Sequence, residues 1–63
     1  MADYEHDALS IPEFCRRHQI SMAMYFKIAR EGIGPRVMRV GRRTIISREA
    51  AEAWRREREI VSA

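Results

Sequence analysis

The chain has 63 residues, of which 46% are hydrophobic and 33% charged, and its formal net charge is +3. This length allows one domain with a thin core, because so short a chain buries only about 60% of the surface that its unfolded form exposes. No apolar run approaches the roughly 18 residues that span a bilayer, no signal peptide opens the chain, and the lone Cys15 cannot form an internal disulfide. We therefore expect a single domain over residues 1–63, in the cytoplasm and without membrane contact.

The charges are distributed unevenly along the sequence. Residues 1–15 carry four acids and no Lys or Arg, whereas residues 16–48 carry nine Lys or Arg against Glu31 alone, a net charge of +8. Eleven of the twelve Lys and Arg residues of the chain are Arg. A solvated basic face is the simpler interpretation of such a cluster. The segregation nevertheless favours contact with a polyanion, since Arg makes forked contacts to phosphate and guanine.

The first predicted helix begins after Ser10. Ser10 and Glu13 form an S-x-x-E capping box, and Pro12 falls in the first turn, where its missing N–H costs nothing. An apolar stripe with helical spacing follows, made of Ile11, Phe14, Cys15 and His18. We expect this stripe to be buried, with Cys15 and His18 as structural side chains. With one Cys and two His in the whole chain, no zinc site is expected.

A second predicted helix begins after Ser21 and ends at Gly32, beyond which Gly34-Pro35 prevents its continuation. Together with the first helix it gives the helix-turn-helix pattern, which many helical hairpins share. Helical angles divide its side chains into two faces. We expect the buried face to hold Met24, Tyr25 and Ile28, joined by Ile20. The presented face then comprises Met22, Ala23, Phe26, Lys27 and Arg30, and an exposed Phe beside a Met is unusual for a plain solvent face.

A β-hairpin is predicted next, from the β-prone runs 36–40 and 44–46 and the glycine between them. Its turn is doubly cationic, because Arg42 and Arg43 follow Gly41. The register stays open, because changing the loop from two residues to three exchanges the faces of the hairpin on which Ile45 and Ile46 lie.

The third predicted helix begins after Ser47, which is a favourable N-cap. One stripe of this helix contains Ala50, Ala51, Trp54 and Arg58. We expect Trp54 to supply the largest single block of the core, and an exposed Trp that stacks on a ligand is the alternative. Residues 1–8 and 60–63 are expected to be flexible.

Helix, turn, helix, basic hairpin and helix are arranged in this order in winged helix-turn-helix domains. The sequence resembles the excisionase and AlpA-type family, which is related to MerR-type DNA-binding domains. The resemblance runs from about Leu9 to Arg58 and rests on ISMAMYFKIAREG (20–32), GPRVMRVGRRTIIS (34–47) and AAEAW (50–54). It implies a mainly α fold with a small β-hairpin. It also implies that the second helix lies in the major groove of DNA and that the hairpin reaches phosphates or the minor groove.

By position, the resemblance implies a set of DNA-binding residues on the second helix and the hairpin. They are Ser21, Met22, Ala23, Phe26, Lys27, Arg30, Arg39, Arg42 and Arg43. The sequence departs from the family pattern at Met22, where a polar or basic residue is frequent, at Ala23, where Ser is, and at Phe26, where Tyr is. Because these positions lack the hydroxyl groups and the charge of the family pattern, the second helix can form fewer hydrogen bonds to base edges and phosphates. We therefore expect the hairpin arginines, defined as Arg39, Arg42 and Arg43, to carry more of the selectivity through DNA shape.

Two functions follow as hypotheses. The first is a DNA-binding protein of a bacterium, phage or mobile element, associated with the nucleoid and acting as an excisionase or a transcriptional regulator. It would bind double-stranded DNA with further copies of itself and, in excision, beside an integrase. The alternative is a small protein-interaction module that uses Met22 and Phe26. An enzyme or a cofactor is not expected, because the sequence holds no catalytic triad, phosphate loop or metal constellation and its core is too thin for a substrate pocket.

Overall fold

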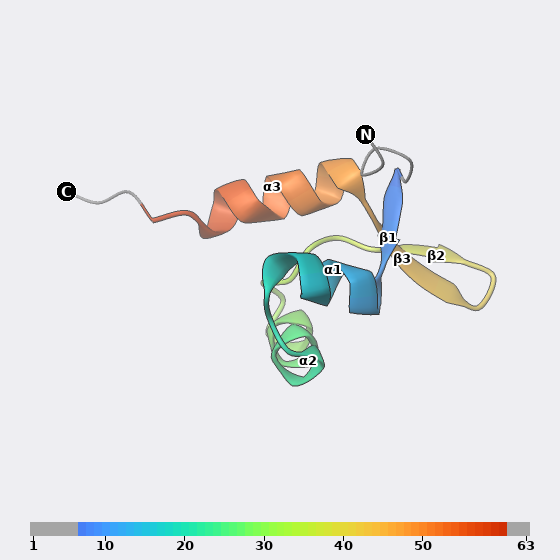
Figure 1. Cartoon of the computed structure of the whole chain (residues 1–63), viewed down its shortest axis with the longest axis horizontal. Helices are drawn as coiled ribbons and strands as arrows, with labels where there is room; N and C mark the ends of the chain where they lie inside the picture. The colour runs from blue at the N-terminus through green and yellow to red at the C-terminus, as the bar shows by residue number, and fades with distance from the viewer. Residues whose placement is uncertain (1–6, 61–63) are drawn as a thin grey trace.

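A computed structural model describes residues 7–60, which form three helices and a three-stranded antiparallel sheet (Figure 1). The elements are β1 (Ala8–Ser10), α1 (Ile11–His18), α2 (Met22–Arg30), β2 (Met38–Val40), β3 (Arg43–Ser47) and α3 (Arg48–Arg58). In Figure 1, α3 runs along one edge of the molecule, α2 lies at the opposite edge, and the β2–β3 hairpin projects at one end. The three predicted helices and the hairpin are therefore confirmed.

Each helix begins after the serine that the sequence predicts as its cap. The side-chain oxygens of Ser10, Ser21 and Ser47 accept hydrogen bonds from the backbone N–H three residues later, at 3.2, 3.0 and 3.0 Å. Each bond satisfies an N–H group for which the first turn of a helix offers no carbonyl. In the predicted capping box, the bond from the Glu13 N–H to Ser10 is present. The Glu13 carboxylate contacts guanidinium groups further along α1.

Helices α1 and α2 end in the same way. In both, two consecutive N–H groups beyond the last turn donate to carbonyls three and five residues earlier, at 3.0 to 3.3 Å. This pair of bonds is the Schellman motif, which places one residue in the left-handed region. That residue is Gly32 after α2, with φ +79°, as the sequence predicts. After α1 it is Gln19, with φ +59°, so the turn between the two helices is fixed without a glycine.

Strand β1 was not predicted, and Ala8 belongs to a segment that was expected to be flexible. β1 pairs with β3 with Leu9 opposite Ile46, so that the strand order is β1-β3-β2. The carbonyl of Asp7 also accepts a hydrogen bond from the N–H of Arg48 at 2.8 Å. Residues 7 and 8 therefore take part in the hydrogen bonding of the fold, and residues 1–6 and 61–63 lie outside the described part of the chain.

The hairpin register is settled by a two-residue turn. Val40 pairs with Arg43, which leaves Gly41 and Arg42 between the strands. Gly41 has φ +60°, the conformation that the first turn residue of a type II′ hairpin requires and that glycine adopts readily. With this register Ile46 is fully buried.

The core is formed by side chains of β1, α1, α2, β3 and α3. Its buried residues are Leu9, Phe14, Cys15, Tyr25, Ile46, Ala50 and Ala51. Phe14 and Ile46 are the largest fully buried side chains. The predicted stripe of α1 is confirmed, since Phe14 and Cys15 are buried and Ile11 and His18 half-buried.

Two predictions about the core are wrong. Met24 was expected on the buried face of α2, but 44% of its surface is exposed. It lies about 100° around the helix from Tyr25, outside the narrow stripe that so short a helix packs. Trp54 was expected to be the largest block of the core, whereas it is half-buried at the edge. Its indole N–H donates to the Ile33 carbonyl at 2.8 Å, and Phe14 occupies the centre.

Candidate nucleic-acid interface

The residues that the sequence predicts as DNA-binding lie on α2, on its cap and on the β2–β3 hairpin. All nine are exposed: Ser21, Met22, Ala23, Phe26, Lys27, Arg30, Arg39, Arg42 and Arg43. In Figure 1 both α2 and the hairpin tip lie away from α3. We call these nine residues the candidate surface.

Helix α2 is oriented by one buried side chain. Tyr25 is 4% exposed, and its ring meets Phe14 edge-on at 6.0 Å between centroids. The face opposite Tyr25 and the half-buried Ile28 is left to solvent, as the helical angles predict. Phe26 remains 48% exposed, although its ring meets that of Tyr25 edge-on at 5.1 Å. A large aromatic ring is therefore held in place and presented on the surface.

The hairpin arginines do not share one face of the hairpin. Arg39 pairs with Thr44, and Arg43 pairs with Val40. Directly paired residues project from the same face, and successive residues project from opposite faces. Arg39 and Arg43 therefore lie on opposite faces, with Arg42 in the turn. The positive charge surrounds the tip of the hairpin.

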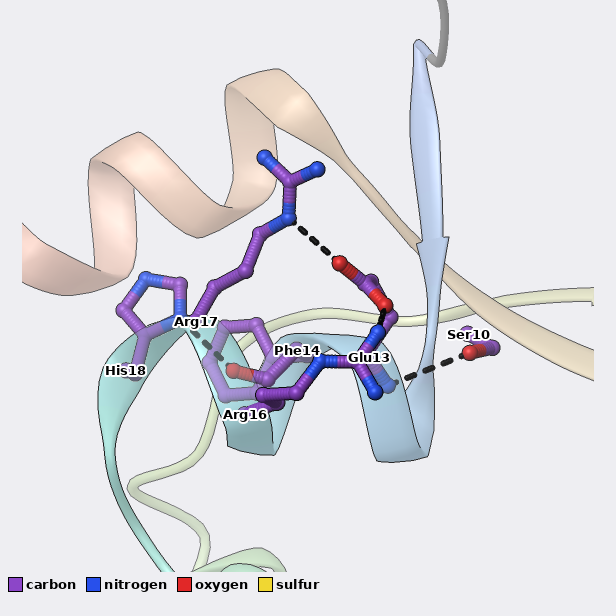
Figure 2. Close-up of polar contacts among 6 residues, drawn as sticks. All are labelled: Ser10, Glu13, Phe14, Arg16, Arg17 and His18. Carbon is purple, nitrogen blue, oxygen red and sulfur yellow. Dashed lines mark hydrogen bonds and ion pairs between the residues drawn. The ribbon is translucent and has the colours of Figure 1, made fainter. Parts of the chain in front are cut away.

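Two further basic residues, which the sequence did not assign to the site, share one carboxylate on α1, and one of them lies beside Arg43 of the candidate surface. Arg16 and Arg17 of α1 are exposed, and both contact the carboxylate of Glu13 (Figure 2). Arg17 and Arg43 line the same hollow of about 300 Å³, together with Glu13 and Ser10. The adjacent Arg pair within the +8 segment was a usable signal, but its position relative to β3 could not be read from the sequence.

A second hollow, of about 340 Å³, lies between the end of α2 and the loop that leads to β2. It is lined by Tyr25, Ala29, Gly32, Gly34, Pro35, Arg36 and Val37. Gly34 approaches α2 closely, because a Cβ added there would lie 3.4 Å from the Ala29 Cα. The loop therefore packs against the end of α2 and connects it to the hairpin.

His18 and Cys15 have structural surroundings, as predicted. The Nδ1 of His18 is 2.8 Å from the Phe14 carbonyl and donates to it, so that Nε2 accepts from Arg55 at 3.0 Å. Burial raises the pKa of the Cys15 thiol above its ordinary value, so that a smaller fraction of the thiol is present as the reactive thiolate.

Over residues 7–60, no cluster of three His, Cys, Asp or Glu residues could hold a metal ion. Within the same range, no helix is long and apolar enough to cross a membrane.

Comparisons with protein-family models, with curated proteins and with solved structures found no significant match. The exposed basic and apolar groups of the candidate surface are therefore the basis on which a function is assigned.

Proposed function

We propose that this protein binds double-stranded DNA as a winged helix-turn-helix domain. Helix α2 enters the major groove, and the β2–β3 hairpin is the wing that contacts the backbone or the minor groove. The observation that carries the proposal is the joint exposure of the basic and apolar groups of α2 and of the hairpin arginines. Both elements lie away from α3 (Figure 1).

The dimensions and chemistry of α2 support its role in the groove. A helix of nine residues is about 13 Å long, and the major groove, about 12 Å wide, admits a helix. Lys27 and Arg30 supply charge toward its C-terminal end. Met22 and Phe26, 40% and 48% exposed, offer apolar contact to thymine methyl groups.

The arrangement of the hairpin supports a role in shape recognition. Arg39 and Arg43 project from opposite faces, and Arg42 lies at the tip. Arginines that reach into or flank a narrow minor groove respond to its enhanced negative potential, which depends on DNA sequence. Selectivity then arises largely from groove shape, since α2 presents few side chains that could hydrogen-bond to base edges.

In biological terms the proposal is an excisionase or a transcriptional regulator of a bacterium, phage or mobile element, without catalytic activity of its own. Either role uses the same domain. So small a domain covers few base pairs, and useful occupancy requires several copies side by side. In excision, the complex would also include an integrase.

A second candidate function is a protein-interaction module, and the exposure of Met22 and Phe26 favours it. These two side chains are 40% and 48% exposed and lie four residues apart, on the same face of α2. Met and aromatic side chains are enriched at protein interfaces. Under this alternative the arginines keep the protein soluble, and a protein partner binds α2 with an affinity that depends little on salt concentration.

Titration of a labelled duplex over a salt series tests the proposal. We expect the logarithm of the binding constant to fall linearly with the logarithm of salt concentration, with a slope of about −0.9 for each phosphate contacted. A handful of arginine contacts then lowers the affinity by more than about tenfold between roughly 0.05 and 0.2 M salt. Absence of binding, or binding that salt does not weaken, would favour the interaction module.

Replacing both tip arginines, as Arg42→Ala with Arg43→Ala, tests the wing. Both side chains are exposed, so the fold should persist while two phosphate contacts are lost. We expect weaker binding to all duplexes and a salt slope smaller in magnitude by about 2. The matched control is Arg56→Ala with Arg58→Ala, which removes two exposed charges from α3. If the two double variants bind alike, the hairpin has no specific role.

A further inference from the structure

We propose that Glu13 restrains a second phosphate-binding surface, formed by Arg16 and Arg17 of α1 and by Arg43 of β3. In the free protein its carboxylate occupies the two α1 guanidinium groups, and a backbone phosphate of the duplex competes with it for them. The inference rests on the proposed DNA binding and deepens it, because it adds α1 to the contact surface and names the residue that limits affinity.

One carboxylate holds two arginines. Glu13 Oε2 accepts from Arg17 Nε at 2.6 Å, and Oε1 contacts Arg16 Nη2. Figure 2 shows the two guanidinium groups approaching the carboxylate from opposite sides. The spacing of three and four residues along α1 brings all three side chains to one side of the helix. Both carboxylate oxygens are thereby used, and two exposed positive charges are reduced to a net charge of +1.

The position of this cluster connects it to the candidate surface. Arg17 shares a hollow of about 300 Å³ with Arg43, which follows the hairpin turn. Strand β1 forms much of the rest of the hollow through Ala8, Leu9 and Ser10, and Glu13 of α1 completes it. A duplex that contacts Arg43 of the hairpin therefore brings its backbone toward Arg17, and Arg16 shares the Glu13 carboxylate with Arg17.

Phosphate is a suitable competitor for the carboxylate. Both groups accept the forked hydrogen bonds of guanidinium. The side chains of Arg16 and Arg17 are 73% and 38% exposed, and exposed ion pairs are weak. Double-stranded DNA carries one negative charge for about every 1.7 Å of its axis, so several phosphates are available to replace the Glu13 carboxylate. Because the Glu13 contacts must break before the arginines bind phosphate, the net binding free energy of these arginines is smaller. Glu13 thus keeps the affinity for DNA below the value that the same arginines would give without it.

The test is duplex binding by Glu13→Gln, compared with Glu57→Gln. The substitution at Glu13 removes the negative charge and keeps the backbone N–H that donates to the Ser10 cap. Glu57 is exposed near the end of α3, so its replacement changes the net charge equally at a distant position. We expect Glu13→Gln to bind about two- to fivefold more tightly than Glu57→Gln at roughly 0.1 M salt. Equal affinities, or weaker binding by Glu13→Gln, would overturn the inference.

A second variant tests the same inference through the arginines. Arg16→Gln with Arg17→Gln should weaken binding and lower the magnitude of the salt slope by about 1 to 2. In that background Glu13→Gln should bring no further gain, because its partners are absent. Unchanged binding by the arginine variant overturns the inference while leaving the proposed function intact. A wild-type chain that shows no salt-dependent binding would overturn both.

Discussion

Phe14 is the residue on which the arrangement of the three helices depends most. It is fully buried, and its ring is stacked on His18 of the same helix at 4.2 Å between centroids. The same ring meets Tyr25 of α2 at 6.0 Å and Trp54 of α3 at 5.2 Å, both edge-on. Such aromatic pairs contribute about 0.5–1.5 kcal/mol each beyond the area that they bury. One side chain of α1 thus fixes where α2 and α3 lie.

Two buried ionisable groups beside Phe14 predict how stability depends on pH. Burial raises the pKa of the Cys15 thiol. Burial, and to a smaller extent the charge on Cys15, raises the pKa of the Tyr25 phenol. The folded state therefore holds both protons more tightly than the unfolded state does. Their contribution to stability is complete below the ordinary thiol pKa of about 8.5 and is lost as the pH rises through the folded pKa values.

We accordingly expect the free energy of unfolding to fall between about pH 7.5 and pH 10. Urea unfolding at the two pH values measures the change, with Cys15→Ala as the comparison. This variant should lose less stability over the same interval, because only Tyr25 then contributes. An equal decline in both proteins would show that the thiol is not the cause.

At the scale of elements, the sequence predicted what depends on near neighbours. Ser21 caps α2 through an N–H three residues away, and Gly32 ends it through bonds that span at most five residues. These interactions are complete within a short window, so residue types alone indicate them. The left-handed Gln19 was not foreseen, because glycine is the usual signal at such a position.

The elements and contacts that were missed depend on distant partners. Strand β1 has three residues, too few for a pattern of alternation, and Leu9 is fixed by Ile46, which follows much later in the chain. The proximity of Arg17 to Arg43 has the same origin, since their common hollow exists only when β1 and α1 pack beside β3. Helical angles gave the exposed face of α2 correctly. They do not show how wide the buried stripe is, and so Met24 was misplaced.

At the scale of the whole molecule, β3 connects the hairpin to the core. It pairs with β1 on one side and β2 on the other, and α3 follows it directly. Ile46 near its end is fully buried, whereas Arg43 at its start lies next to the hairpin turn. The orientation of the hairpin relative to α1 and α2 therefore depends on how β3 packs in the core through Ile46. Strand β1 supports this arrangement, because Leu9 packs there opposite Ile46.

The dependence on β1 gives a prediction for stability. Leu9 is 9% exposed, and Leu→Ala at a buried position costs about 2–5 kcal/mol. A single core of this size rarely supplies more than about 3–5 kcal/mol. We therefore expect Leu9→Ala to unfold much of the population at room temperature, which circular dichroism and urea titration would measure.

The control for this prediction is Ile60→Ala, which also shortens an aliphatic side chain but at a position 90% exposed. Its effect should remain within about 0.5 kcal/mol. Similar stabilities of the two variants would mean that β1 is not part of the supporting structure. If Leu9→Ala is destabilised as expected, its affinity for the duplex should fall in proportion to the unfolded fraction, because α2 and the hairpin depend on the same core. A loss of binding without loss of helix content would instead place Leu9 near the DNA contact.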